Sequence, residues 1–238
     1  MSNLLNLANQ VNSIKEEIRQ AIIAKGVNVL TTDPFSVYPT KIASIDGTTH
    51  RYALLERVTD DNNIEIGTVS GFFTDENDVE YAVVLLDARY RLASGIWCSS
   101  TTAVTNMPMY SNWNIWTSTE TATTNTQYIL DFCTANNYTS SACEHCRTLS
   151  FVVDGVTYYG QLPNIIELND ICRKYSTLNN KDGSDSSYSS LLLSSKNTWS
   201  SSQYNATYGW YAISLGSMYS TTKTNSYFVA PVLEIPNT

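Results

Sequence analysis

A pair of cysteines two residues apart is where this sequence most readily suggests metal or redox chemistry. The tetrapeptide CEHC at residues 143–146 has the spacing at which two thiolates bind one tetrahedral metal ion. A complete site needs two more ligands, for which we look to Cys133, Cys172 and His50. There is no second Cys-x-x-Cys motif, and a thioredoxin-type pair lies where a strand leads into a helix. We therefore expect core or helix-adjacent thiols, with no bound metal and no cofactor.

Other catalytic motifs are missing from the sequence. It contains no G-x-S-x-G, Walker loop or H-E-x-x-H motif, and His50 and His145 are its two histidines. The carboxylates Glu76 and Asp78 are close in sequence, but their stretch is typical of a solvated hairpin tip. We expect no enzymatic activity, since an enzyme would need a metal or a reactive thiol at the CEHC tetrapeptide.

The composition is that of a folded protein with few charges. Of the 238 residues, 42% are hydrophobic and 15% charged, and the net charge of −8 with no basic stripe argues against a nucleic-acid partner. No apolar run approaches the ~20 residues that cross a bilayer, and the N-terminal stretch lacks the pattern of a signal peptide. The odd number of cysteines, five, fits a reduced compartment. We expect free thiols, assembly in a cytoplasm and no membrane insertion.

Residues 1–25 are predicted to form a helix that associates with other copies. Apolar residues recur at alternating spacings of three and four, the a/d pattern of a coiled coil, at Leu4, Leu7, Val11, Ile14, Ile18 and Ala21. Gly26 is placed to end the helix. Mixed β-branched and Leu residues on this seam favour a homotrimer over a dimer. The alternative is an amphipathic helix that packs on its own domain, because Ala8 and Ile22 widen the apolar stripe.

Residues 26–47 are predicted to be an extended connector. Two X-Pro steps, Asp33-Pro34 and Tyr38-Pro39, force extended or turn backbone. IRQAIIAKGVNV followed by PFSVYPTKIASI resembles a segment near the ends of bacteriophage tail and fibre proteins, where it anchors or trimerises the subunit. The resemblance implies other virion proteins as partners of the N-terminal segment.

Residues 48–238 are predicted to form one α+β domain. β-Branched runs from Ile64 and Val79 flank an acidic turn and predict a hairpin, and Asp154-Gly155 predicts a second one. Helices are expected from Thr126 and, with Pro163 and Asn164 at its start, from Leu162. Strands follow to the C-terminus, so the expected order is strands, helix, hairpin, helix and strands.

Five stretches together resemble the C-type-lectin-like fold of bacteria and phages. They are TETATTNTQYI (119–129), SSACEHCRTLSF (140–151), YYGQLPNIIELNDI (158–171), TWSSSQYNATYGWYAISLGS (198–217) and YFVAPV (227–232). In that group an LP..EL helix precedes WSS, an aromatic strand, a Gly turn and a terminal V.PV strand. The group includes variable proteins of diversity-generating retroelements, phage receptor-binding tips, surface lipoproteins and sulfatase-modifying enzymes. The usual Arg of the last strand is Ala230 here, there is no clustered acidic loop of the calcium-binding kind, and no cysteine follows Cys172.

The stretch from 197 to 227 is rich in Tyr, Ser, Thr and Asn around Trp199 and Trp210. Antibody paratopes share this composition, because Tyr offers large contact area at small entropy cost while Ser, Thr and Asn adapt their hydrogen bonds. We place both tryptophans, Val229 and Val232 in the core, with Ser200 and Ser201 bonding backbone groups nearby. The candidate ligand-binding residues are the expected loop and edge positions Gln203, Tyr204, Asn205, Thr207, Tyr208, Tyr219, Ser220, Thr221, Thr222, Asn225 and Tyr227.

These features predict a non-catalytic protein of a phage virion, in a tail or head fibre. An N-terminal coiled coil would display C-type-lectin-like domains that bind a host receptor or glycan, with avidity from several sites. The alternative is a decoration or connector protein of the capsid or tail, which binds other virion proteins and no host ligand.

Overall fold

The computed structural model describes residues 2–23, 29–38, 50–75, 77–112, 121–174, 177–178, 196–213 and 217–237, with backbone only for 2–9, 22 and 23. The chain divides into two compact units, Met1–His50 and Arg51–Thr238. Gly26 and most of the expected connector lie outside the described residues, as does Glu76. In the described part of the chain, no helix is both long and apolar enough to span a membrane.

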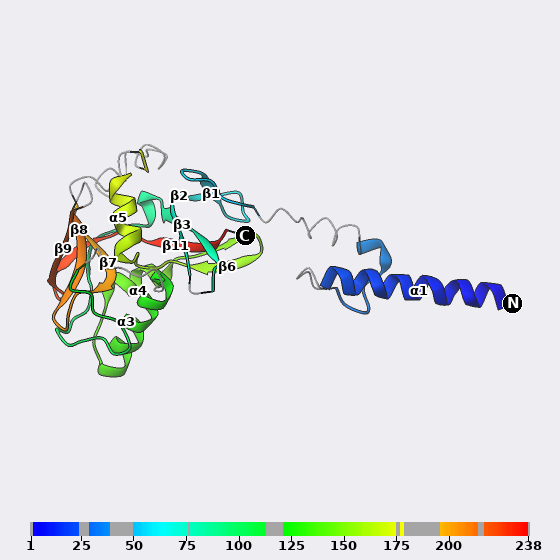
Figure 1. The fold of residues 1–238 in the computed structure, drawn as a ribbon, viewed down its shortest axis with the longest axis horizontal. Coiled ribbons are helices and arrows are strands. Elements are labelled where there is room, and N and C mark those ends of the chain that lie inside the picture. The colour runs from blue at the N-terminus through cyan, green and yellow to red at the C-terminus, as the bar shows by residue number, and fades with distance from the viewer. Residues whose placement is uncertain are drawn as a thin grey trace. The chain divides into compact units, whose positions relative to one another are not determined.

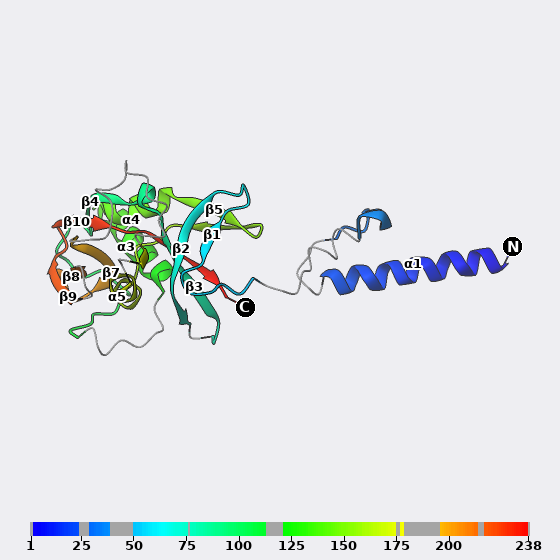
Figure 2. The ribbon, with the colours of Figure 1, turned by 90° about the horizontal axis from the view of Figure 1, so that it is seen from above.

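The first unit contains helix α1 (Ser2–Ile23) and a short 3-10 turn, η1 (Phe35–Val37) (Figure 2). Ile18 packs with Val37 against buried Val29 and Tyr38. Val11 and Ile14 are instead 54% and 53% exposed, and Ala21 is exposed as well. The side chains of Leu4 and Leu7 lie outside the described set. The residues in the middle of the proposed seam are therefore not covered by other residues of the first unit. The coiled coil stays a prediction.

The second unit is a mixed α+β domain, as predicted from the sequence (Figure 1). A four-stranded antiparallel sheet has the order β1 (Arg57–Thr59), β2 (Glu65–Thr74), β3 (Glu80–Leu86), β11 (Val232–Pro236). A five-stranded sheet has the order β4 (Leu92–Ile96), β10 (Ser226–Val229), β7 (Thr198–Gln203), β8 (Tyr208–Ile213), β9 (Ser217–Thr222). The turn η2 (Ala88–Tyr90) leads from β3 toward β4.

Both predicted hairpins are confirmed. In the β2–β3 pair, the Asp75 carboxylate accepts hydrogen bonds from the backbone N–H groups of Asn77 and Val79 and so closes the turn. The strands β5 (Ser150–Val153) and β6 (Val156–Tyr159) meet at Asp154 and Gly155, whose φ angles of 52° and 75° are both left-handed. The Asp-Gly sequence suits this turn because Gly adopts positive φ without a Cβ penalty.

The two predicted helices are confirmed, and a third lies between them. Helix α5 (Ile165–Arg173) starts at a capping box in which Asn164 and Glu167 satisfy each other's backbone N–H groups. Helix α3 (Ala122–Asn136) begins one turn before the expected start, because the Thr121 side chain caps it. Helix α4 (Ser141–Thr148), capped by Ser140, was not expected and carries the CEHC tetrapeptide.

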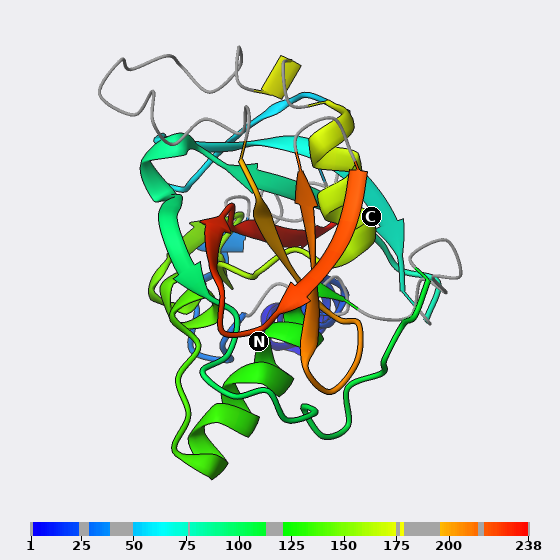
Figure 3. The same ribbon diagram turned by 90° about the vertical axis from the view of Figure 1, so that its left-hand side faces the viewer.

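The five-stranded sheet is packed on both faces. Trp210, Ala212 and Met218 pack against α5 on one face. Trp199 and Val229 belong to the core cluster that includes residues of α3 and α4. The placement of the two tryptophans, Val229 and Val232 in the core is confirmed, since all four are at most 5% exposed. Figure 3 shows β7, β8 and β9 toward the viewer.

The ends of the second unit are tied together. Strand β11 pairs with β3 from Val232 to Pro236. Asn237 Oδ1 accepts a 2.6 Å hydrogen bond from the Tyr52 N–H, and its own backbone N–H donates to Glu80 O at 2.7 Å. The C-terminal strand therefore closes the four-stranded sheet against residues at the start of the unit.

Candidate functional site

The predicted ligand-binding residues lie in one region but not on one surface. Successive side chains of a strand point to opposite faces, so on β8 Tyr208 shares a face with Trp210, and Tyr211 lies on the other. Across the β8–β9 register, Tyr211 pairs with Tyr219, while Trp210 pairs with Ser220. Thr222 pairs with Tyr208, and Thr221 pairs with Gly209. The sheet therefore divides the predicted set between its two faces.

Tyrosines cover Trp199 on one face, and we call Tyr211, Tyr219 and Tyr227 the tyrosine row. The Tyr211 ring centroid lies 4.7 Å from that of Tyr227 and 6.0 Å from that of Tyr219. Tyr227 and Tyr211 contact the Trp199 ring at 4.8 Å and 6.2 Å. Tyr219 is 48% exposed, while Tyr211 and Tyr227 are half-buried. The row is a supported aromatic surface whose outermost member faces solvent.

A second aromatic pair lies at the β7–β8 loop. Tyr204 contacts Trp210 edge-on at 5.1 Å and Tyr208 at 6.4 Å, and Tyr208 is 39% exposed. Asn205 Oδ1 accepts hydrogen bonds from the N–H groups of Thr207 and Tyr208, so this side chain shapes its own loop. Asn225 in turn donates to Thr221 Oγ1 at 2.7 Å. These polar candidates are partly engaged inside the domain.

The expectation that Gln203 lies at the surface is wrong. Its side chain is fully buried, and its Oε1 atom accepts hydrogen bonds from the Val104 N–H and from Lys223 Nζ. Its Nε2 group donates to Met107 O at 3.3 Å. The Gln203 side chain therefore ties the segment around 104–107 to β7. It is not one of the candidate surface residues.

Lys223 is a buried cation that the sequence did not reveal. Its side chain is 0% exposed, and Nζ donates to Thr102 O at 3.1 Å and Ala206 O at 2.7 Å, besides Gln203. Nζ also lies 4.8 Å from the centroid of the Trp97 ring, a cation–π contact. Burial lowers the pKa of Lys223 to about 8. Lys223 therefore links the loop at Thr102 to the loop at Ala206. Because its ammonium group is buried, it adds no charge to the surface of the predicted site.

The five cysteines are free thiols and all are buried. Cys143 and Cys146 lie in α4 within the same core cluster as Cys133, whereas Cys172 packs in a different cluster under β8. Burial raises the pKa of Cys143 to about 12 and that of Cys146 well above its usual value. Among the described residues, no three His, Cys, Asp or Glu side chains are grouped to hold a metal ion.

Two other cysteines make a direct contact. The Sγ atoms of Cys98 and Cys133 lie 3.5 Å apart. Their hydrogen bond lowers the pKa of Cys98 to about 7 and raises that of Cys133. Cys98 is 0% exposed and Cys133 2%, so neither sulfur is offered to a substrate in this structure.

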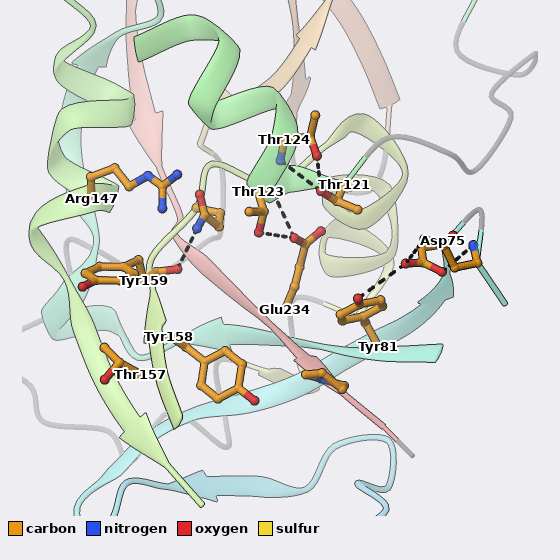
Figure 4. A pocket seen from close by; sticks show the side chains of 13 residues that line it. Asp75, Tyr81, Thr121, Thr123, Thr124, Arg147, Thr157, Tyr158, Tyr159 and Glu234 are labelled. Atoms are coloured by element: carbon orange, nitrogen blue, oxygen red, sulfur yellow. Dashed lines mark hydrogen bonds between the residues drawn. The ribbon is translucent and has the colours of Figure 1, made fainter. Parts of the chain in front are cut away.

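A pocket of about 490 Å³ lies beside the four-stranded sheet (Figure 4). Its volume is within the ~300–1,000 Å³ range of ligand sites. It is lined by the start of α3, by β6, by α4 through Arg147, and by the β3 and β11 strands. The lining residues are Asp75, Asn77, Tyr81, Thr121, Thr123, Thr124, Arg147, Thr157, Tyr158, Tyr159, Gln161, Glu234 and Pro236. None of them was predicted as a site residue, because they come from segments far apart in the chain.

A buried carboxyl pair lies behind this pocket. Glu234 accepts hydrogen bonds from the N–H groups of Ala122 and Thr123 and from the Thr123 hydroxyl, so its charge is stabilised at the start of α3. Burial, with the nearby charge of Glu234, raises the pKa of Glu167 well above its usual value.

Comparison with known proteins adds no identification. No protein-family model matches the chain, and no curated protein matches it either.

Proposed function

We propose that this chain is a non-catalytic binding protein of a phage particle, part of a tail or head fibre. In this proposal, α1 joins copies into an oligomer, most simply a trimer, and attaches them to other virion proteins. The second unit is a C-type-lectin-like domain that binds a host receptor or glycan. The LP..EL helix, WSS strand and aromatic strand of the resemblance correspond to α5, β7 and β8, and its V.PV stretch runs from the end of β10 to the start of β11, which supports this fold assignment.

The observation that carries the proposal is the tyrosine row. Tyr219 presents a half-exposed ring that is supported by Tyr211, which in turn packs on buried Trp199. Rigid aromatic side chains that combine an apolar ring with a hydroxyl are enriched at binding hot spots. A support that is already packed means that little side-chain entropy is lost when a ligand binds.

Two tyrosines on opposite faces of the sheet provide a matched test. Tyr219 is 48% exposed and Tyr208 is 39% exposed, so each should tolerate Ala without loss of fold. We expect Tyr219→Ala to weaken adsorption of the purified oligomer to host cells by ~30-fold, the effect of losing ~2 kcal/mol at a hot spot, while Tyr208→Ala binds as the parent does.

Thermal melts of both variants show whether the fold is intact. Trp199→Ala should instead lower the melting temperature, since such core truncations cost ~3–5 kcal/mol. If Tyr219→Ala melts normally and adsorbs like the parent, the row is not the binding surface. A capsid or tail decoration role would then be the better explanation.

A further inference from the structure

We propose that the pocket beside β6 and the start of α3 binds a sugar residue that carries a carboxylate, of the uronic acid class. Figures 1 and 2 show β8 and β9 at one end of the second unit and β6 and the end of β11 toward the other. The pocket is thus separate from the tyrosine row, and the proposal holds whether or not the row binds a receptor.

A tyrosine of the lining can stack on one face of a pyranose ring. Tyr158 and Tyr159 are adjacent on β6, and Figure 4 shows their rings on opposite sides of that strand's end, with Tyr81 beyond Tyr158. Tyr159 is 50% exposed and Tyr158 is half-buried. Burial raises the pKa of Tyr158 and of Tyr81, so these hydroxyls keep their protons at neutral pH. Each ring offers an apolar face for sugar C–H groups and a hydroxyl at its edge.

The polar lining fits a ligand with hydroxyl groups. Gln161 is 3% exposed, and its Nε2 group donates to Tyr159 O at 3.0 Å, which fixes the orientation of the amide. Its Oε1 atom has no donor among the residues that the structure describes. Thr157 and Asn77 add a hydroxyl and an amide to the same lining. The pocket therefore presents both acceptors and donors of neutral type, as a polyol requires.

Arg147 gives the pocket its preference for an anion. Its guanidinium donates to the neutral Gln127 Oε1 at 2.7 Å and forms no ion pair with the described carboxylates. The two carboxylates of the lining are already engaged: Glu234 by the α3 backbone, and Asp75 by its own hairpin. A ligand carboxylate is the partner that the planar guanidinium binds best, through two parallel hydrogen bonds.

Titration with two small sugars tests the assignment. Methyl glucuronide and methyl glucoside share the pyranose ring and differ in the carboxylate, and saturation-transfer NMR measures weak binding of each. We expect the full-length protein to bind the glucuronide at least about fivefold more tightly than the glucoside. Arg147→Gln should remove that preference with a loss of about tenfold for the glucuronide, the usual effect of a lost charge-assisted bond.

Matched variants show whether the pocket is the site. Tyr159→Ala should weaken the binding of both sugars. Tyr219→Ala removes a ring of similar exposure from the tyrosine row and should leave the affinity for both sugars unchanged. Arg51→Gln removes an equal charge outside the pocket and should also leave binding unchanged. Equal affinity for the two sugars would refute the role of Arg147. No saturable binding of either sugar, or a loss with Tyr219→Ala alone, would overturn the proposal.

Discussion

Replacement of Lys223 by Met tests how the loops around the predicted site are held. Met has similar length and no charge, so it can occupy the space while it removes one donor each from Thr102 O, Ala206 O and Gln203 Oε1. Of these, Gln203 Oε1 keeps the Val104 N–H. A hydrogen bond to a charged group contributes ~1.5–3 kcal/mol, and water can replace part of it at the exposed residues Thr102 and Ala206. We therefore expect the variant to be less stable at pH 7 by ~1 kcal/mol or more, because the ~3 kcal/mol that a pKa shift from 10.5 to about 8 represents offsets part of the lost hydrogen bonds.

The pH dependence of this difference has a defined sign. The folded pKa of Lys223, about 8, lies below its ordinary value of 10.5, so between these pH values the unfolded chain holds a proton that the folded chain has released. Stability then rises with pH. Relative to Lys223→Met, the wild-type protein should gain ~1–2 kcal/mol between pH 7 and pH 9.5, from the 1.36 kcal/mol that each pKa unit represents.

Urea unfolding followed by tryptophan fluorescence measures both effects. Titrations of the many tyrosines are common to the two proteins and cancel in the difference. Lys196→Met, at a half-buried lysine, is the control and should cost little. Parallel stability curves for wild type and Lys223→Met across this pH range would refute the burial argument, and equal stability at pH 7 would refute the hydrogen-bond argument.

Three further outcomes follow from the structure. Since the folded chain keeps the Glu167 proton above the ordinary pKa of 4.5 while the unfolded chain releases it, wild-type stability should fall as the pH rises above 4.5, and Glu167→Gln should reduce this pH dependence of the urea midpoint. Val11→Asp with Ile14→Asp should convert a sedimenting oligomer to monomer, because a buried unpaired charge costs several kcal/mol; a wild-type monomer at micromolar concentration would remove the coiled coil. The five buried thiols should react with a thiol dye in urea and not in the folded protein, and equimolar zinc that is lost together with the fold would contradict the structural role of the thiols.

Local features of this fold could be predicted because their causes are local. The Asp154-Gly155 turn needs only two residues that accept positive φ, and the α5 capping box needs only Asn164 and Glu167 three residues apart. The start of α3 was expected too late: the Thr121 cap is local, but part of the stabilisation comes from Glu234, a partner more than a hundred residues away. Contacts of this kind leave no trace in a short window of sequence.

The candidate site was harder to predict, for two different reasons. The split between Tyr208 and Tyr211 follows from the two-residue period of a strand, so a stricter use of that period would have found it and would have added Tyr211 to the set. The burial of Gln203 and Lys223 could not be found in this way. Polar side chains in loop-rich stretches are usually exposed, and their burial depends on acceptors at Thr102 and Ala206 that only the tertiary fold provides.

The scarcity of charge gives the two proposed sites different physical characters. The tyrosine row consists of neutral groups, so contacts made there should depend little on ionic strength even though the protein carries a net charge of −8. The pocket lining holds Arg147 together with neutral donors and acceptors and two carboxylates, Asp75 and Glu234, so the proposed preference for an anion depends on direct contact with one guanidinium. The backbone N–H groups give Asp75 and Glu234 partners other than Arg147 but leave their negative charge in place, so a ligand carboxylate must lie nearer to Arg147 than to either of them. A carboxylate in the lining that lacked such partners would pair with Arg147 and abolish the preference.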